Sequence, residues 1–292
     1  MLNRIKAELL NFGLKFMSVD EKIVRIFLEA APSHVRDIVI LPAIKSVMKQ
    51  FLLKLKNKTS HGRIFNGTLN GVPVSVIRSF VGCPNMAITM ECLKRTNAKI
   101  VIRIDYCGGL NVHNEEISVG DTIIPKSACG GDGTCLYYLN VYKQKQDTFS
   151  FISNPLNEIF TFYSGINTLP IFEPDDQLKN LLLQAGKSKH ERYVKEANLY
   201  TIDALFCETT EVLSALKSIK IQAIDMESSI LFLLGKLFNL NVASILAVSD
   251  LPGHPQHDLF KTNTIHPELE NGLKRTMEIL LDALPRIQKL LQ

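Results

Sequence analysis

Short, continuous apolar runs separated by helical patterns constrain the fold of this chain more than any other feature of its sequence. Residues 37–41, 99–104 and 242–248 each read as a strand that is buried on both faces. Apolar residues recur at helical spacing in four longer segments, at about 45–56, 84–97, 227–237 and 266–291. Strands that alternate with helices in this way are typical of a sheet with helices packed on both faces.

Other segments add to the same sheet. Asn70-Gly71 lies between two alternating apolar runs and predicts a β-hairpin. Further strands are expected at 122–125, 193–202 and 222–225 and further helices at about 174–185 and 210–218, whereas 130–170 gives no clear pattern. We therefore expect an α/β fold, a three-layer αβα sandwich with a central mixed β-sheet. No repeat or composition break divides the chain, so we expect one domain over residues 1–292, with 1–35 as an N-terminal helical extension.

Composition excludes several broad classes. The chain has 46% hydrophobic and 21% charged residues, which rules out global disorder. Its 33 basic residues nearly balance 29 acidic ones, and a net charge of +4 is too small to indicate nucleic acid as the main partner. From Lys45 to Arg63 the chain carries six basic residues and no acid, which fits either a solvated helix face or a rim that attracts anions.

Cysteine spacing and the apolar runs indicate the compartment. Six cysteines stand at 83, 92, 107, 129, 135 and 207, without a Cys-x-x-Cys pair or a His–Cys cluster at zinc spacing. The N-terminus lacks the apolar stretch of a signal peptide, and the longest apolar run, near 230–234, is far too short for a membrane span. We expect a cytoplasmic protein with free thiols, no bound metal and no membrane partner.

Polar residues at the predicted strand ends are the candidates for chemistry, because ligands of α/β proteins gather at the carboxyl ends of strands. Arg103 lies inside an apolar strand, and a buried guanidinium needs either a carboxylate, such as Asp105, or a bound anion. Asp225 and Glu227 stand where a strand ends and a helix begins. They fit either charge stabilisation of the helix N-terminus or, for Glu227, hydrogen bonds from vicinal sugar hydroxyls.

Ser249-Asp250 follows another strand directly and precedes a loop with two histidines. Asp250 is there either a helix cap or a general acid beneath a loop that closes over it. The sequence contains no phosphate-binding P-loop, Gly-x-Ser-x-Gly elbow, His-Glu-x-x-His pair or Gly-x-Gly-x-x-Gly fingerprint. Kinase, α/β-hydrolase, zinc protease and dinucleotide-dependent dehydrogenase chemistry are therefore excluded.

Several segments, taken in order, resemble the nucleoside phosphorylase and nucleosidase superfamily, of the purine nucleoside phosphorylase and uridine phosphorylase type. Ala223-Ile-Asp-Met-Glu-Ser-Ser229 is similar to its ribose-binding segment, and Val248-Ser-Asp250 to the Ser-Asp that ends a late strand in purine-acting members. Ile102-Arg-Ile-Asp-Tyr-Cys-Gly-Gly-Leu110 is similar to its phosphate-binding segment. Further elements match at 81–85, 119–124 and 131–134, so the resemblance covers about residues 37–285.

The resemblance implies an enzyme that cleaves the N-glycosidic bond of a nucleoside with phosphate, giving free base and ribose 1-phosphate. It implies no cofactor other than phosphate as co-substrate. In the sugar site, Glu227 would bind the ribose hydroxyls, with Met226 packed on the sugar and Asp225 beside it. Asp250 would protonate purine N7 or hydrogen-bond the leaving base. Three further residues would contact the base: Leu205, Phe206 and Ser249.

Arg103 and Tyr106 would form the phosphate site, and there the sequence departs from the family pattern. Asp105 and Tyr106 replace a small Gly–Thr/Ser pair, and Pro42-Ala43-Ile44 replaces the Gly-Asp-Pro turn whose amides hold phosphate. An acid at this position repels phosphate. These departures favour, as the alternative, a nucleosidase that uses water, because 107–110 also looks like AMP nucleosidase, or a non-catalytic member that binds nucleoside.

The resemblance also implies a base and an assembly. The Gln-x-Arg pair with which uridine phosphorylases read uracil is not visible after Phe206, and Asp250 suits a purine N7, so we expect a purine nucleoside. Members of the family are dimers, trimers or hexamers, so we expect a homo-oligomer. The implied partners are thus a small-molecule nucleoside, phosphate and further copies of this chain.

Overall fold

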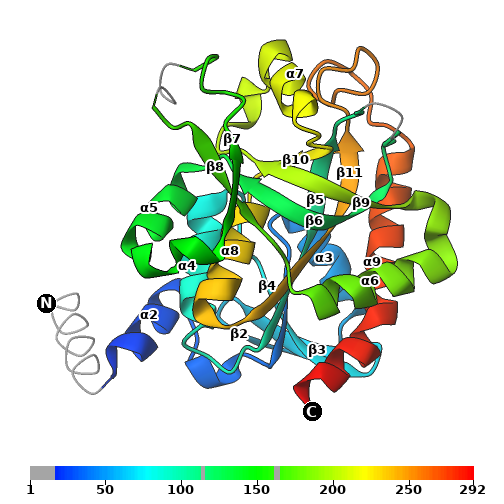
Figure 1. Cartoon of the computed structure of the whole chain (residues 1–292). Helices are drawn as coiled ribbons and strands as arrows, with labels where there is room; N and C mark the ends of the chain where they lie inside the picture. The colour runs from blue at the N-terminus through cyan, green and yellow to red at the C-terminus, as the bar shows by residue number, and fades with distance from the viewer. Residues whose placement is uncertain (1–16, 113–115, 161–164) are drawn as a thin grey trace, which may run out of the picture.

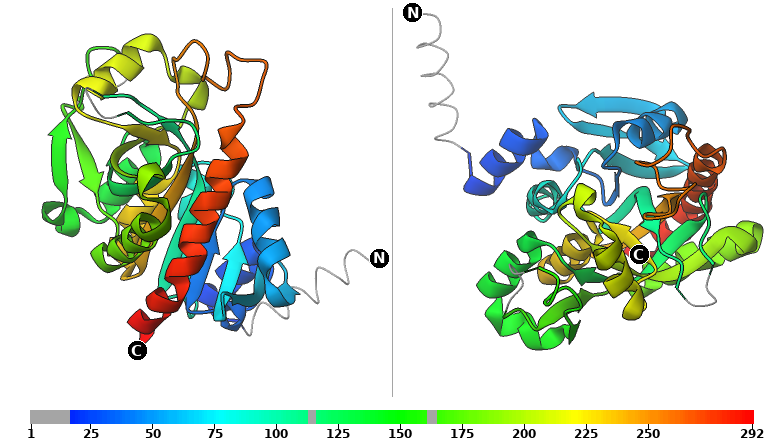
Figure 2. Two further views of the ribbon diagram at one scale, coloured as in Figure 1. Left: turned by 90° about the vertical axis from the view of Figure 1, so that its right-hand side faces the viewer. Right: turned by 90° about the horizontal axis from the view of Figure 1, so that it is seen from above.

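The computed structural model describes residues 17–112, 116–160 and 165–292. Within these ranges an 11-stranded mixed sheet lies between layers of helices (Figures 1 and 2), which confirms the predicted αβα sandwich. The helical extension predicted for 1–35 is described only in part. Helix α2 spans Val19–Leu28 and a 3-10 turn, η1, covers Pro32–His34, whereas residues 1–16 lie outside the described part.

The strands follow the order β2-β3-β4-β1-β5-β10-β9-β6-β8-β7, and β11 pairs with both β5 and β6. Their bounds are β1 Ile38–Leu41, β2 Lys56–His61, β3 Ile64–Leu69, β4 Val72–Ile77, β5 Ile100–Gly109, β6 Thr122–Gly130, β7 Ser150–Ser153, β8 Thr168–Phe172, β9 Val194–Thr201, β10 Ala223–Asp225 and β11 Asn241–Asp250. The central strands β1, β5 and β11 are parallel to one another and almost wholly buried, as their apolar runs predicted.

Strand β5 is the point at which the sheet branches. Its first half pairs with β1, and β11 pairs with it from Ile100 to Gly108, whereas Gly108 and Gly109 at its end pair antiparallel with β10. Strand β10 also pairs with β9, β9 with β6, and β6 with β11, which pairs with β5. The strands β5, β10, β9, β6 and β11 therefore form a closed ring. The ends of β5 and β11 therefore meet at β10, and this junction positions the candidate site.

Helices cover the two faces of the sheet, and the sheet separates two large apolar clusters, each of which lies between it and one layer of helices. On one face lie α2, α4 (Cys83–Leu93), α5 (Gly133–Val141) and α8 (Ser228–Phe238). On the other face lie α3 (Lys45–Lys54), α6 (Asp176–His190) and α9 (Glu268–Gln288). Helix α7 (Thr210–Ser218) packs on a smaller third cluster. The other 3-10 turns among the described residues are η2 Lys143–Thr148, η4 Glu191–Tyr193, η5 Leu205–Cys207 and η6 Lys289–Leu291.

Most predicted elements are found within a few residues of their expected bounds, and the hairpin turn is confirmed. Asn70 and Gly71 both have positive φ, at 46° and 80°, as a two-residue turn between β3 and β4 requires. The expected end of the strand at Ile104 was wrong, because β5 continues to Gly109. Gly108 and Gly109 are needed there because a Cβ would lie 2.7 Å from a side-chain carbon of Pro252 or Ile117, respectively.

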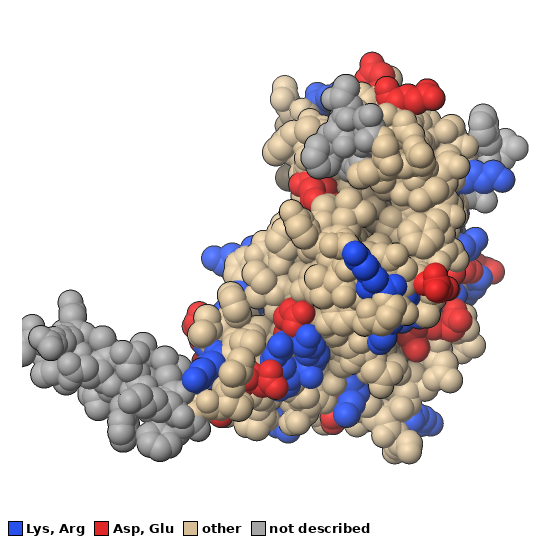
Figure 3. Space-filling view, turned by 60° about the vertical axis from the view of Figure 1, so that its left-hand side comes forward, with Lys and Arg blue, Asp and Glu red and all other residues tan. Residues whose placement is uncertain are grey.

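The distribution of surface charge and the length of the helices are relevant to nucleic-acid and membrane partners. On the face shown in Figure 3, acidic and basic side chains are interspersed. The basic run from Lys45 to Arg63 is divided between α3, the exposed strand β2 and the turn that follows it, so its charges do not share one helix face. Among the described helices, none is long and apolar enough to cross a membrane.

Candidate functional site

A cavity of about 250 Å³ opens where β5, β10 and β11 meet. Side chains reach it from these strands, from η5 and from the loop after β11. The sequence-predicted site residues that line it are Arg103, Tyr106, Leu205, Asp225, Met226, Glu227, Ser249 and Asp250. Residues more than a hundred positions apart in the sequence are thus brought to one cavity, at the strand ends where the α/β rule predicts a ligand.

Phe206 is the predicted site residue that does not line this cavity. It is 83% exposed, and its ring packs edge-on against Phe260 with ring centroids 5.2 Å apart. In the η5 turn, Leu205 faces the cavity and the next side chain points away. A second aromatic residue besides Tyr106 lines the cavity, namely Phe260 in the loop after β11, which the sequence reading did not single out.

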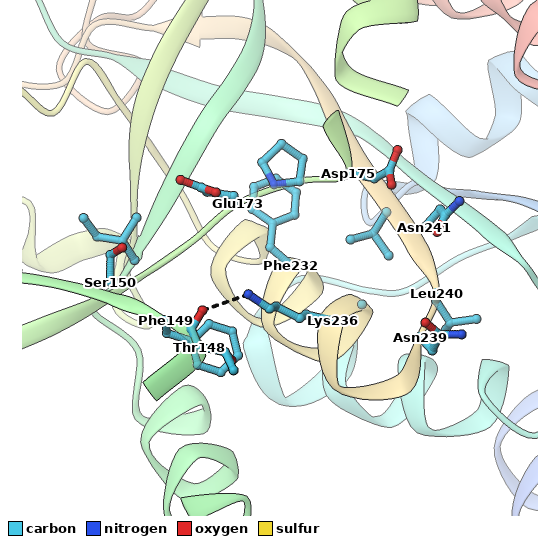
Figure 4. Close-up of a pocket in the computed structure, with 14 residues that line it drawn as sticks. Thr148, Phe149, Ser150, Glu173, Asp175, Phe232, Lys236, Asn239, Leu240 and Asn241 are labelled. Atoms are coloured by element: carbon cyan, nitrogen blue, oxygen red, sulfur yellow. Dashed lines mark hydrogen bonds between the residues drawn. The ribbon is translucent and has the colours of Figure 1, made fainter. Parts of the chain in front are cut away.

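A second cavity, of about 300 Å³, lies at the opposite end of β11, beside Asn241 (Figure 4). Its only described basic side chain, Lys236, donates from Nζ to the carbonyl oxygen of Thr148 at 2.8 Å and lies over the Phe149 ring. This cation is therefore already engaged by the chain itself. The second cavity contains none of the predicted site residues and borders the amino end of the strand.

Arg103 is the centre of a buried ion-pair network in the first cavity. Its Nη1 donates to Asp225 Oδ2 at 2.7 Å, and its Nη2 donates to Glu227. The side chains of all three residues are at most 3% exposed. The sequence left open whether this guanidinium pairs with an acid or holds an anion, and named Asp105 as one possible acid. The structure pairs it with Asp225 and Glu227, and this charge-assisted pairing raises the pKa of Arg103 further.

Asp225 serves the architecture of the site. One of its oxygens accepts from the Thr201 hydroxyl at 2.7 Å, and the other accepts from Arg103 and from the backbone N–H of Ser228 at 2.9 Å. The last of these bonds holds the start of α8, as an acid near a helix N-terminus predicts. Asp225 therefore fixes Arg103 and α8, and its oxygens are already engaged.

Glu227 is held by a turn from a distant part of the chain. The backbone N–H of Gly82 donates to Glu227 Oε1 at 2.7 Å. Gly82 has a φ of 99°, which a residue with a side chain rarely adopts, and it directly precedes α4. Burial raises the pKa of Glu227 to about 7 in spite of the adjacent Arg103 cation, with the Asp225 charge acting in the same direction as burial. This carboxyl is fixed in place and able to accept further hydroxyl hydrogen bonds.

Asp105 occupies the backbone turn that follows β1. Its Oδ2 accepts from the N–H groups of both Ala43 and Ile44, the latter at 2.9 Å, and its Oδ1 accepts from Tyr106 N–H at 3.0 Å. Helix α3 begins directly after Ile44, so the carboxylate also lies at a helix N-terminus. Burial nevertheless raises the pKa of Asp105, although the Arg103 charge and the three N–H groups lower it.

Asp250 ends β11 and faces the cavity together with Ser249. The Ser249 hydroxyl lies 2.6 Å from Asp250 Oδ1 and 3.1 Å from the Cys107 carbonyl oxygen, and its single proton can be donated to either. Asp250 Oδ2 accepts from Leu259 N–H at 3.4 Å, which ties the loop after β11 to the strand end. Burial raises the pKa of Asp250, the direction that a general acid requires.

Glu208 is a candidate functional residue that the sequence reading missed. It lines the cavity directly after η5, and burial raises its pKa to about 8, with the charges of Asp250 and Asp258 adding to the effect. The only sequence signal was its place in 207–210, where a base-reading pair was sought and not found. Two carboxyl groups thus face the same part of the cavity, and Glu208 carries a proton at neutral pH.

In the part of the chain that the structure describes, one group of side chains outside the cavity has the spacing of a metal site. Ligand atoms of Cys83, Asp132 and Asp203 lie within 4.8 Å of one another. Asp132 is already engaged by the Ser229 hydroxyl at 2.6 Å and by the backbone N–H of Cys135. Burial raises the pKa of the Cys83 thiol well above its usual value, which disfavours the thiolate that a metal would need. The chemistry of this group does not fit a bound metal.

Comparison with known proteins shows what this chain is similar to. The family profile described as the phosphorylase superfamily matches residues 37–285. A DeoD-type purine nucleoside phosphorylase from Brevibacillus brevis is 30% identical over 222 residues, which are 75% of this chain and 78% of that protein. Another, from Bacillus cereus, is 24% identical over 268 residues, or 88% of this chain and 97% of that protein.

Solved structures share the fold. The purine nucleoside phosphorylase from Toxoplasma gondii, in complex with immucillin-H, superposes with a TM-score of 0.67 at 19% identity, over 90% of this chain and 98% of that chain. The uridine phosphorylase from Vibrio fischeri ES114, complexed with 6-hydroxy-1-naphthoic acid, gives 0.65 at 21% identity, over 87% and 94%. At these identities the likeness concerns the arrangement of the elements.

Proposed function

The chain belongs to the phosphorylase superfamily, and on that premise we propose that it cleaves the N-glycosidic bond of a purine nucleoside in the cavity between β5, β10 and β11. One observation carries the proposal. A fixed, buried carboxyl group (Glu227) and an acid with a raised pKa (Asp250) line the same cavity, at the strand ends where α/β proteins bind their ligands.

The two carboxyl groups have separate roles. Breaking the bond between C1′ and the base leaves positive charge on the sugar and negative charge on the base. Asp250, whose pKa is raised by burial, donates a proton to N7 of the purine or hydrogen-bonds it. Glu227 accepts hydrogen bonds from the ribose 2′- and 3′-hydroxyls, with Met226 against the sugar.

Three observations support a purine as the base. Glu208 is neutral at pH 7 and lines the cavity near Asp250, so the pair offers both a donor and an acceptor to the edge of a ring system. Leu205 and Phe260 provide apolar surface for its faces. The relatives from Brevibacillus brevis and Bacillus cereus are both named purine nucleoside phosphorylases.

The sequence predicts phosphate as the acceptor of the ribosyl group, with water as the alternative. Arg103, the expected phosphate ligand, already donates to two carboxylates, and the amides after β1 already bind Asp105. Tyr106, the second expected ligand, packs against the apolar cluster between the sheet and α9. These contacts favour water.

The experiment is a measurement of base release from adenosine, inosine, guanosine, uridine, methylthioadenosine and AMP, each with and without inorganic phosphate. We expect release from one or more purine nucleosides, and little from uridine. Preferential release of uracil would contradict the purine assignment. Binding of nucleosides without release of base from any of them would contradict the catalytic proposal and favour a non-catalytic nucleoside-binding protein.

A further inference from the structure

Two consecutive backbone N–H groups, from Ala43 and Ile44, point at one carboxylate oxygen of Asp105. Such a pair, at the start of a helix, is an anion-binding arrangement in many proteins. Here the anion belongs to the chain itself. Asp105 is 2% exposed, and a third N–H group, from Tyr106, donates to its other oxygen. A second anion can reach these amides only by expelling a carboxylate that three hydrogen bonds hold.

The charges around the cavity oppose an anionic acceptor as well. The described side chains that line it include one basic group, Arg103, against four acids besides the neutral Glu208, namely Asp105, Asp225, Glu227 and Asp250. The guanidinium of Arg103 is paired through both Nη atoms, which leaves Nε as its nitrogen without a hydrogen-bond partner. Phosphate carries between one and two negative charges at neutral pH, and buried carboxylates beside it would repel it.

From this arrangement we propose that Asp105 takes the place of the anion in the acceptor site, so that the ribosyl group is transferred to water and the enzyme is independent of phosphate. The proposal rests on the proposed function, because it names the acceptor of the same reaction. It also restricts the substrate to uncharged nucleosides, since the acids that line the cavity would repel a nucleotide phosphate in the same way.

Residues that line the cavity donate and accept the protons that the reaction moves. Asp105 Oδ1 accepts one N–H, from Tyr106, and a carboxylate oxygen can accept a second hydrogen bond, here from water. As the bond between C1′ and the base breaks, its electron pair leaves with the base, which takes a proton from Asp250. The water oxygen forms a bond to C1′ and its proton passes to Asp105. Ribose and free base result, and both acids return to their starting states by proton exchange with solvent.

Direct binding of inorganic phosphate tests the occupied anion site without relying on activity. We expect titration calorimetry to detect no phosphate binding to the wild-type protein at millimolar concentrations. Asp105→Gly frees the amides of Ala43 and Ile44 and removes one negative charge, so this variant should bind phosphate. Phosphate binding by the wild type that is as tight as binding by Asp105→Gly would overturn the proposal.

Product analysis tests the acceptor. The wild type should release base at the same rate with and without phosphate, giving ribose, whereas the Asp105→Gly variant should be stimulated at least about tenfold by phosphate and give ribose 1-phosphate. Asp105→Asn fills the same space without a charge. It should lose base release and gain no response to phosphate, because its side-chain oxygen still accepts from the amides.

A matched control separates the change of acceptor expected for Asp105→Gly from the loss of a side chain at a helix N-terminus. Asp175 caps α6 by accepting from Leu178 N–H at 2.9 Å, and it borders the second cavity at the far end of β11. Asp175→Gly should lower thermal stability as Asp105→Gly does and leave the acceptor unchanged.

Strictly phosphate-dependent release by the wild type would contradict the proposal and leave the proposed cleavage standing. Absence of base release from every nucleoside would contradict the proposed cleavage, and phosphate binding would still decide whether the anion site is occupied.

Discussion

Arg103 Nη1 donates to Asp225 Oδ2 at 2.7 Å across 122 positions of sequence, and both side chains are buried. Because Arg103 lies on β5 and Asp225 on β10, this bond joins the two strands at which the sheet branches. The same guanidinium holds Glu227 at the start of α8. The network therefore links the stability of the fold to the position of the carboxyl group proposed to bind ribose.

Arg103→Met tests the contribution of this network to stability. The substitution leaves Asp225 and Glu227 buried without their cation, and breaking a buried pair costs about 3–5 kcal/mol. Urea denaturation should show a loss of free energy of unfolding of this size. The control is Arg25→Met, which removes the exposed pair between Arg25 and Glu21 and should cost less than about 1 kcal/mol. Equal, small losses in both variants would contradict the account.

Asp250→Asn tests the proposed general acid. The amide cannot protonate the departing base, so we expect kcat/KM for purine nucleosides to fall by about 10²–10⁴-fold. The circular dichroism spectrum and melting temperature should stay close to those of the wild type, because the amide oxygen can still accept from Leu259 N–H. Unchanged turnover would remove Asp250 from the chemistry.

Glu227→Gln tests whether Glu227 accepts hydrogen bonds from the ribose hydroxyls. The variant loses the negative charge that accepts hydrogen bonds from the ribose hydroxyls, and we expect turnover of ribosides to fall by about 10²-fold. Turnover of 2′,3′-dideoxynucleosides, which offer no such hydroxyls, should change much less. If both substrate classes lose the same factor, Glu227 does not bind the ribose hydroxyls.

The pH dependence of base binding tests Glu208. Its pKa is raised to about 8, so its proton is present at neutral pH and is lost as the pH rises through about 8. The new negative charge then adds to those of Asp250 and Asp258, and KM of the wild type should rise above this pH. Glu208→Gln stays neutral, and its KM should remain flat over the same range. Parallel profiles for the two proteins would show that Glu208 does not contact the base.

The sequence predicted the fold class and most of the site because both depend on local patterns. The apolar runs at 37–41 and 242–248 mark strands that are buried on both faces, and the polar residues at strand ends stand where α/β proteins bind their ligands. Arg103, Glu227 and Asp250 were found in this way, and all three line the cavity.

The features that were missed depend on tertiary contacts. The extension of β5 through Gly108 and Gly109 follows from its pairing with β10 and β11, which no local pattern reveals. The outward direction of Phe206 follows from the η5 turn. The proton on Glu208 depends on burial beside residues more than 40 positions away. The sequence indicated that Asp105 disturbs a phosphate site, but its bonds to the amides after β1 required the structure.

The most direct test of the central claim is a crystal structure with a purine C-nucleoside, whose carbon–carbon glycosidic bond cannot be cleaved by this chemistry. We predict that the base lies beside Asp250 and Glu208, with the ribose hydroxyls donating to Glu227 and a water molecule on Asp105. A nucleoside bound elsewhere, or one in this cavity with its sugar directed away from Glu227, would contradict the account.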